Sequence, residues 1–495
     1  MNYILGLDIG TTHAKIIAMS SAGEKLYASK ESYEPVQGLA VGYHEFHPDI
    51  VRDAAVKLLL AAIAALPGKT PAGISMSTAM HSLMLVDEKG KPLTNLITWA
   101  DQRSAEQAKR IREKGDAIAL YKKTGTPVHP MSPFCKIQWI KEHQNKVFRS
   151  AYKFIGIKEY IVHYLCGSYF VDHGIASATG LFNIKDKCWD VSILKQLEVS
   201  AAQLAATVPA TFQSNVSNKQ FLQLSGVATA LPVVAGSSDG ALANLGSGAF
   251  GEKRLSITVG TSGAVRKIVH NRILDEQAAN FCYVFDDKHY ITGGPINNGG
   301  NLLKWFCQSM LNRPLNTDHE TNNFFNLEDP SGQPLFLPYI HGERAPVWDA
   351  EAKGIFFGID SSHTINDFQH SVGEGICYSL RQLVQLSDKL HGHSDAIILS
   401  GGLSNSNRFT RLLATVLDRD ITVSDDADAS SIGACLLGWK ALGAIEKYEE
   451  LLPEITQDDI VSPDKTLVPQ HDARFRIFEK LYEANVLLMH ELGKK

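Results

Sequence analysis

An order of elements predicted near the start of the chain occurs again after its midpoint, and this repetition constrains the fold most strongly. Residues 3–7 alternate as in a β-strand, Gly10, Thr11 and Thr12 form a turn, and residues 14–19 alternate again. A second strand–turn–strand unit is predicted over residues 255–269. Alternation with a period of two indicates strands, and glycine beside hydroxyl residues is typical of a tight turn. The repetition predicts a duplicated α/β domain.

Both units continue with a mixture of strands and helices. After the first unit, the patterns predict a strand at 25–33, a helix at 48–66 and a strand at 72–78. After the second unit, they predict strands at 281–285, 290–292 and 396–400, and helices at 299–310, 365–390 and 405–417. Such a mixture of strands and helices in each half is typical of the α/β class.

The length of 495 residues is too great for one ordinary hydrophobic core, so we expect two domains, residues 1–245 and 246–495. The formal net charge is −5 and no stretch is strongly basic, which argues against a nucleic-acid partner. No apolar run approaches the roughly 20 residues that span a bilayer, and the N-terminus reads as a strand instead of a signal peptide. We therefore expect a cytoplasmic protein without a membrane partner. A homodimer is left open.

The seven cysteines are scattered and form no CxxC pair, so we expect reduced thiols and neither a disulfide framework nor a zinc site.

Two glycine motifs resemble nucleotide-binding loops but are not interpreted as such. Gly68, Lys69 and Thr70 resemble the end of a P-loop, but the first glycine of that motif is missing and a helix precedes it. Residues 246–251 match GxGxxG, but a strand follows the motif instead of preceding it, so we predict a linker between domains.

The first turn is a candidate phosphate site. Glycine allows a ligand to approach the backbone closely, and the hydroxyls of Thr11 and Thr12 with free amides can bind phosphate oxygens. Asp8 could hold a hydrated Mg²⁺, and Lys15 could reach a terminal phosphate. The alternative is an ordinary hairpin turn. The second turn, which contains Gly260 and Thr261, has the same two interpretations.

A third candidate segment lies between a predicted strand and a predicted helix. Gly401 and Gly402 would let a flat adenine ring lie against bare backbone, while Asn405 could cap the helix. The alternative is a helix start that only requires small residues.

In the middle of the chain, Asp239 follows a glycine-containing loop and could act as a general base for a sugar hydroxyl. Its structural alternative is the N-cap of a short helix.

A possible sugar site follows the apolar residues 96–98. The ring of Trp99 could cover a sugar, and Asp101 and Arg103 could bond its hydroxyls. Met80 and His81, just after a predicted strand, could join them. Each of these residues could equally be an ordinary core or surface residue.

Taken together, these residues resemble the FGGY family of carbohydrate kinases over nearly the whole chain. Residues 131–143 match its first signature throughout. The second is matched by residues 354–359, 367–368 and 371–372 and by Glu374, although Gly373 stands where the family usually has a larger apolar residue.

The resemblance implies two actin-like, ribonuclease H-like domains with a catalytic cleft between them and ATP bound in it. It implies that Asp239 is the catalytic base and that Asp8 holds Mg²⁺ through water. It places ATP against Asp8, Thr11, Thr12, Lys15, Gly260, Thr261, Gly300, Gly401, Gly402 and Asn405. It places the small-molecule sugar substrate against Met80, His81, Trp99, Asp101, Arg103 and Asp172.

Residues 125–133 resemble the gluconokinase branch more than the xylulokinase or glycerol kinase branches. The resemblance therefore implies D-gluconate as the substrate, phosphorylated at its 6-hydroxyl, with xylulose or another sugar or polyol as the alternative. An acid substrate needs cationic partners, and Arg103, His81, His129 and Lys136 are the candidates. A remote alternative is an ATP-driven actin-like chaperone or scaffold, which would not require the first signature, Asp239 or the Trp99 cluster.

Overall fold

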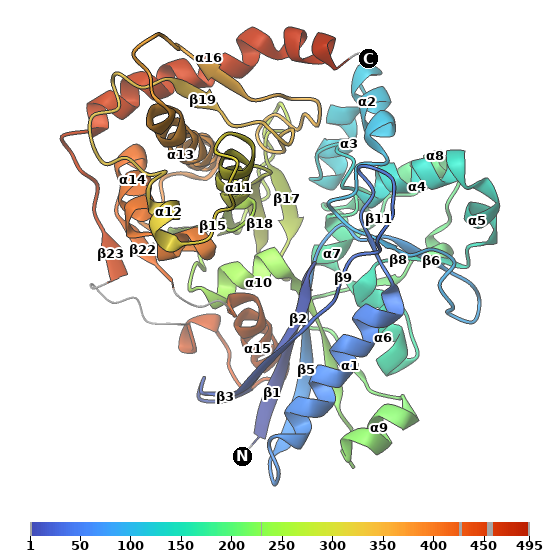
Figure 1. Cartoon of the computed structure of the whole chain (residues 1–495). Helices are drawn as coiled ribbons and strands as arrows, with labels where there is room; N and C mark the ends of the chain where they lie inside the picture. Colours follow the sequence, from blue (N-terminus) through green and yellow to red (C-terminus); the bar gives the residue numbers. More distant parts are fainter. Residues whose placement is uncertain (1, 229, 425–427, 453–458, 494–495) are drawn as a thin grey trace.

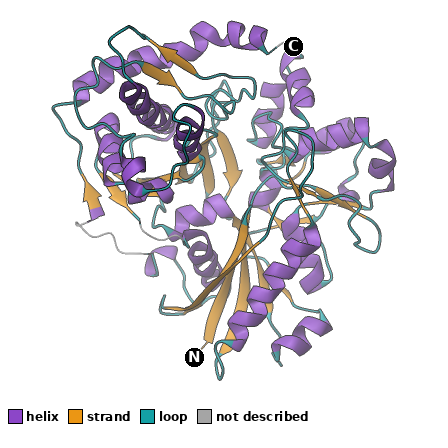
Figure 2. Ribbon diagram, in the orientation of Figure 1, coloured by secondary structure: helices purple, strands orange, loops and turns teal. Residues whose placement is uncertain are grey.

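The computed structural model describes residues 2–228, 230–424, 428–452 and 459–493. Two mixed sheets, one from each half of the chain, form the centres of two α/β lobes, and helices flank the strands (Figures 1 and 2). The central strands of both sheets are buried along almost their whole length, because helices cover the sheets and pack against their apolar side chains.

The first sheet is centred on β1 (Asn2–Ile9). On one side β2 (His13–Ser20) and then β3 (Lys25–Ser32) continue it as antiparallel strands. On the other side β5 (Thr70–Thr78) and β14 (Pro232–Ser238) run parallel to β1, and β13 (Gln213–Asn215) closes the edge.

The second sheet repeats this plan around β15 (Arg254–Val259). The strands β16 (Gly263–Val269), β18 (Tyr290–Ile296) and β17 (Phe281–Val284) extend it antiparallel. The strands β21 (Ala396–Ser400) and β22 (Ile421–Val423) run parallel to β15, and β23 (Ile460–Val461) is added at the edge. The common plan confirms the predicted duplication. The division at residue 245 stays a prediction.

The first lobe carries α1 (Pro48–Ala64), which begins with Pro48 at its first position and buries Val51, Leu58 and Leu59 against the sheet. A set of smaller elements is inserted between β5 and β13: β6 (Met84–Val86), β7 (Leu96–Ile97), α2 (Ala105–Glu113), α3 (Ala117–Thr124), α4 (Pro133–His143), α5 (Asn145–Ser150), β8 (Lys153–Ile155), α6 (Ile157–Cys166), β9 (Phe170–Asp172), α7 (His173–Ser177), β10 (Phe182–Asn183), β11 (Cys188–Trp189), α8 (Val191–Leu197) and β12 (Ala206–Val208). Strand β4 (Glu45–Phe46) precedes α1, and α9 (Lys219–Ser225) precedes β14.

The second lobe contains the longest helix, α13 (Ile365–His391), which packs on β16 and β18. Its other elements are α11 (Gly300–Ser309), α12 (Asp318–Asn322), β19 (Leu335–Leu337), β20 (Ile355–Phe357), α14 (Asn407–Leu417) and α16 (Val468–Leu492). The helix predicted over 405–417 begins at Asn407, because residues 402–405 form a separate 3₁₀ turn.

Two helices join the lobes. The helix α10 (Asp239–Gly246) crosses α15 (Ala429–Ala441), and α15, from the C-terminal half, lies against β1, β2 and β5 of the first sheet (Figure 1). The crossing is close: a Cβ atom on Gly433 would lie 2.0 Å from the carbonyl oxygen of Leu242. A glycine is therefore required where the two helices meet.

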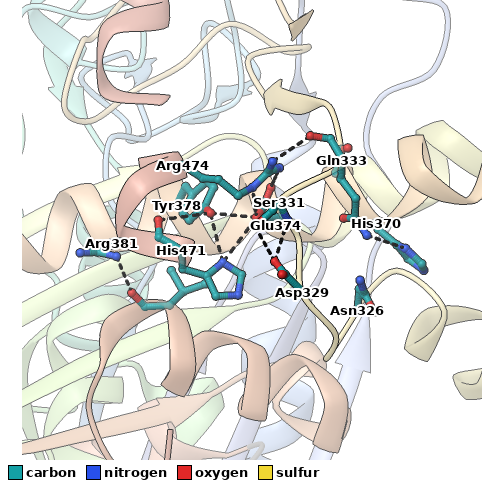
Figure 3. Close-up of polar contacts among 12 residues, drawn as sticks. Asn326, Asp329, Ser331, Gln333, His370, Glu374, Tyr378, Arg381, His471 and Arg474 are labelled. Carbon is teal, nitrogen blue, oxygen red and sulfur yellow. Dashed lines mark hydrogen bonds and ion pairs between the residues drawn. The ribbon is translucent and has the colours of Figure 1, made fainter. Parts of the chain in front are cut away.

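The C-terminal helix α16 is tied to α13 by a buried polar network (Figure 3). The guanidinium of Arg474 donates from Nε to the carboxylate of Glu374 at 2.8 Å, and a second nitrogen pairs with the other carboxylate oxygen. The hydroxyl of Tyr378 donates to Glu374 at 2.8 Å and lies 3.1 Å from Nδ1 of His471. Glu374, a residue of the second signature, therefore holds two helices together.

The structure also places the cysteines and the two glycine motifs that were set aside in the sequence. All seven cysteines are free thiols. Residues 247–253 are a connection between α10 and β15, and Gly68 lies in the loop between α1 and β5, so neither glycine motif forms a nucleotide loop. Within the described ranges, none of the helices has the length and apolar character that crossing a membrane requires.

Candidate active site

A cavity of about 220 Å³ lies between the two lobes, and we call it the central cavity. From the first half it is lined by Thr11, Met80, His81, Trp99, Met131 and Asp239. The second half contributes residues of β16 and its neighbours, among them Arg266, Phe281, Tyr283 and Arg344. The fold thus brings three predicted sugar contacts to the predicted base.

A second cavity, of about 370 Å³, lies in the second lobe. Its lining includes Gly260, Thr261, Gly300, Gly402 and Asn405, as expected from the sequence, and also Lys304, Asp318 and Asn322, which sequence reasoning missed. Its size lies within the range of small-molecule sites.

The turn between β15 and β16 borders both cavities. Gly260 and Thr261 line the second cavity, while Ser262 and Gly263 line the central one. A group that is transferred from a ligand in one cavity to a ligand in the other would therefore pass this turn.

The two glycines after β21 have different reasons to be glycine. Gly401 has φ of 95°, and a Cβ atom there would lie 2.6 Å from the carbonyl oxygen of Val259. Gly402 lines the second cavity, and no heavy atom of the described residues lies within 4 Å of its Cβ position. The first glycine is required by the backbone, whereas the second leaves space that a ligand can use.

Asp239 lies in the first turn of α10, directly after β14. The N-cap is Ser238, whose hydroxyl accepts from the amide of Ala241 at 3.3 Å, so the N-cap interpretation of Asp239 was wrong by one residue. Gly236 has φ of 71° and lies where the β14–β5 register shifts, and a Cβ atom there would clash with the backbone of Met76. This bulge directs the end of β14, and with it Asp239, into the cavity.

The carboxyl of Asp239 is poised between protonation states. Burial raises its pKa to about 6, the charge of Asp8 adds to the rise, and the guanidinium of Arg266 opposes it. A carboxylate with a pKa near neutrality can accept a proton from a hydroxyl more readily than an ordinary aspartate.

Asp8 ends β1 beside the first turn. Its two oxygens accept hydrogen bonds from Ser77 at 2.6 Å and Ser430 at 2.7 Å, and burial raises its pKa. Lys15, its antiparallel neighbour in β2, forms a salt bridge of 3.5 Å with Asp428.

The hydroxyl of Thr11 accepts from Nε1 of Trp99 at 2.9 Å, which links the first turn to the sugar-site tryptophan. The hydroxyl of Thr12, on the exposed side of the turn, lies 2.9 Å from Nδ1 of His13.

Three of the predicted sugar contacts do not line the central cavity. Asp101 is fully buried, where it accepts from Nε of Arg103 at 2.8 Å and from the amide of His44 at 2.7 Å. The guanidinium of Arg103 is stacked on Tyr43 at 4.1 Å and also pairs with Glu45. These residues brace the loop that carries Trp99, and their predicted role is not supported by this geometry.

Asp172 lies behind the base instead of beside the cavity. It caps α7 and forms a buried salt bridge with Lys158. The same ammonium donates to the carbonyl oxygens of Ala235 and Ser237 at 2.9 and 3.0 Å. Asp172 and Lys158 therefore hold both sides of the Gly236 bulge that directs Asp239.

His81 lines the central cavity, and one of its ring nitrogens is held by the backbone. Its Nδ1 lies 2.7 Å from the carbonyl oxygen of Ala178, which can only accept, so Nδ1 carries the proton. Burial lowers its pKa to about 3, and Lys136 lowers it further. The ring is neutral, and Nε2 is left to accept a hydrogen bond from a ligand hydroxyl.

The four residues expected as cationic partners of an acid substrate are neutral, paired or enclosed in the structure. His81 is neutral, Arg103 is paired with two carboxylates, and the ammonium of Lys136 is enclosed by three carbonyl oxygens. His129 is fully buried, and burial lowers its pKa well below the usual value. None of the four presents a positive charge to the central cavity.

Two arginines that sequence reasoning missed line the cavity instead. Arg344 is 8 % exposed, lies 4.9 Å over the ring of Trp99 and donates to the carbonyl oxygen of Ile296 at 2.9 Å. Nε of Arg344 and Nε of Arg266 are buried, and neither has a hydrogen-bond partner within the part of the chain that the structure describes. Burial lowers the pKa of both, that of Arg344 to about 10. A charged residue within the apolar strand β16 is the signal that could have identified Arg266.

Comparisons with known proteins identify the family of this chain. Residues 3–246 match the N-terminal domain model of the FGGY family of carbohydrate kinases, and residues 255–442 match its C-terminal domain model. The chain belongs to the FGGY family of carbohydrate kinases. Membership makes it a phosphotransferase and implies ATP as the phosphoryl donor.

Individual relatives differ in their named substrates. A gluconokinase of Bacillus subtilis (strain 168) is 33% identical, with 97% of each chain covered. The structure of a gluconate kinase from Lactobacillus acidophilus superposes with a TM-score of 0.93 at 30% identity, covering 99% of both chains. That of a ligand-bound xylulose kinase from Lactobacillus acidophilus gives the same TM-score and identity, covering 99% of this chain and 100% of the other.

The glycine at position 402 provides a test of the second cavity as the nucleotide site. Gly402→Val is expected to raise the Kd for ATP at least roughly tenfold, because a branched side chain would occupy space that the ligand uses. Isothermal titration calorimetry with a non-hydrolysable ATP analogue measures this change. Gly332→Val, in a loop where a Cβ atom also has open space, is the control and should bind normally. An unchanged Kd in folded Gly402→Val would remove this segment from the site.

Proposed function

We propose that this kinase transfers the γ-phosphoryl group of ATP to the 6-hydroxyl of D-gluconate, yielding 6-phospho-D-gluconate and ADP. The observation that carries the proposal is the presence of two guanidinium groups without a salt-bridge partner among the described residues in the cavity that also contains Asp239. An acid substrate would supply the missing anion, and charged hydrogen bonds of this kind contribute about 1.5–3 kcal/mol each.

The acceptor sugar is assigned to the central cavity and the nucleotide to the second cavity. The cavities meet at the β15–β16 turn, so the γ-phosphoryl group would lie beside the turn amides. The first turn would face it from the other lobe, with Thr11, Thr12 and Lys15 as its predicted contacts. Backbone amides and a lysine can stabilise the charge on the transferring group.

Asp239 is proposed as the general base. As the sugar oxygen attacks phosphorus, its proton passes to the Asp239 carboxylate, the bond between phosphorus and the bridging oxygen breaks, and ADP leaves. Most of the rate enhancement in phosphoryl transfer comes from positioning and charge stabilisation, so a base of modest strength is sufficient.

The residues present fit a magnesium ion. Asp8 and Asp239 lie close enough for the charge of one to raise the pKa of the other, and oxygen ligands of this kind suit Mg²⁺. Asp8, with one hydroxyl donor on each oxygen, would hold the ion through water molecules. When bound, Mg²⁺ neutralises phosphate charge.

The sugar itself would be recognised by three residues of the first lobe. Nε2 of His81 would accept from a hydroxyl, and Trp99 with Met80 would cover the carbon chain. Asp101, Arg103 and Asp172 would support these residues from behind without contacting the sugar.

D-Xylulose is the second candidate, because the xylulose kinase structure matches this chain as well as the gluconate kinase structure does. A coupled ADP assay with both substrates decides between them. We expect kcat/KM for D-gluconate to exceed that for D-xylulose by roughly 10- to 100-fold, the equivalent of one charged hydrogen bond. A preference for D-xylulose would contradict the gluconate proposal and leave the kinase assignment unchanged.

A further inference from the structure

One buried cation near the central cavity has no part in the chemistry proposed above. Lys136 belongs to α4 and its side chain is fully buried. Its ammonium donates to the carbonyl oxygens of His81 at 2.6 Å, Thr98 at 2.7 Å and Met131 at 2.8 Å. An ammonium has three N–H groups, and each has one acceptor here.

The three acceptors lie on three separate segments that line the central cavity. His81 and Met131 line it themselves, and Thr98 precedes Trp99, which also lines it. These segments follow β5, follow β7 and precede α4, so no single strand or helix fixes their relative positions. One ammonium group therefore joins the parts of the first lobe that would contact the sugar.

The segment of His81 in particular needs such support. His81 has φ of 65°, a left-handed conformation that is unfavourable for a residue with a side chain. Its ring is held by the carbonyl oxygen of Ala178 and its own carbonyl oxygen by Lys136. Both contacts fix the direction in which Nε2 points.

Burial makes the charged form of the Lys136 side chain unfavourable. Its pKa falls to about 7 through burial, with Arg103 adding to the fall and Asp101 and the thiol of Cys135 opposing it. Lys136 in turn lowers the pKa of three histidines near it, His44, His81 and His129. Lys158, the comparable buried lysine behind Asp239, has a carboxylate partner in Asp172, whereas the acceptors of Lys136 are three neutral carbonyls. An apolar side chain of similar length would fill the space with less desolvation.

We propose that Lys136 is a positioning residue that sets the shape of the sugar site by fixing the relative positions of the segments of His81, Trp99 and Met131. This inference rests on membership of the carbohydrate kinase family and on the proposed placement of the sugar in the central cavity. It does not depend on which sugar is the substrate.

The test is Lys136→Met, assayed with whichever sugar the unmodified enzyme turns over fastest, so that failure of the gluconate proposal does not affect it. We expect KM for the sugar to rise at least roughly tenfold and kcat to fall less, because misplaced contacts weaken sugar binding first. KM for ATP should stay within about twofold, since the nucleotide cavity lies in the other lobe.

Lys267→Met is the matched control. Lys267 is also fully buried and also donates to carbonyl oxygens, those of the C-cap residue Gly392 at 2.8 Å and of His391, the last residue of α13, at 3.4 Å. We expect this variant to lose thermal stability while its sugar KM stays unchanged. If Lys136→Met changed only the Tm, or if the control raised the sugar KM equally, the positioning role would be overturned.

Hydrogen exchange of the unmodified enzyme keeps the proposal testable if Lys136→Met does not fold. Residues 79–83, 97–100 and 129–132 should gain protection together when the sugar is added, and should not respond to an ATP analogue alone. Independent changes in the three segments would contradict the proposal.

Discussion

Asp239→Asn is expected to lower kcat by roughly 10²- to 10⁴-fold, the usual effect of removing a general base, while ATP binding stays nearly unchanged. The amide cannot accept the proton of the attacking hydroxyl, and Asp239 does not line the second cavity. A coupled ADP assay measures kcat, and calorimetry with an ATP analogue measures binding. Wild-type turnover in this variant would reduce Asp239 to a structural residue of α10.

The pH profile separates loss of the base from loss of the fold. Because the pKa of Asp239 is about 6 in the folded protein, kcat/KM of the unmodified enzyme should fall tenfold per pH unit below that value. The residual activity of Asp239→Asn should lack this fall at low pH, which is the acid limb of the profile. Above pH 6 the folded protein carries a carboxylate that burial disfavours, and this charge lowers the stability of the fold. Replacing the carboxylate with a neutral amide should therefore not lower the Tm at pH 8.

The second large effect is expected from the two arginines of the central cavity. Arg266→Met and Arg344→Met are compared with D-gluconate and with D-glucitol, which has an uncharged hydroxymethyl group in place of the carboxylate. We expect at least one variant to reduce the ratio of kcat/KM for gluconate to that for glucitol by roughly 10- to 100-fold, the equivalent of one charged hydrogen bond. Glucitol serves as the control within each variant, because a general defect affects both substrates equally.

The two variants should differ in their pH dependence. Arg266 holds down the pKa of Asp239, so Arg266→Met should move the acid limb to higher pH. Arg344 has no such effect on Asp239, and its variant should leave the limb in place. An unchanged gluconate-to-glucitol ratio in both variants would contradict binding of a carboxylate by this cavity.

Much of the scaffold of the site could be predicted from the sequence because it is local. The strand over residues 396–400 lies at the predicted residues, and the hairpins around Gly10 and Gly260 form as the alternation and turn residues indicated. A strand with a period of two, followed by a glycine turn, is encoded within about ten neighbouring residues. The duplication followed from the same local signals found twice.

The contents of the central cavity were decided only by the tertiary structure. Arg344 lies over Trp99, and Lys158 reaches Ala235 and Ser237, across separations in sequence that no local pattern encodes. Asp101 and Asp172 were predicted to contact the sugar because their ion-pair partners could not be predicted from local sequence. In the structure Asp101 pairs with Arg103 and Asp172 with Lys158, and neither aspartate lines the central cavity. The residues near a turn are set by their neighbours in sequence, but the charge that faces a ligand depends on which side chains the packing of the two lobes leaves without a partner.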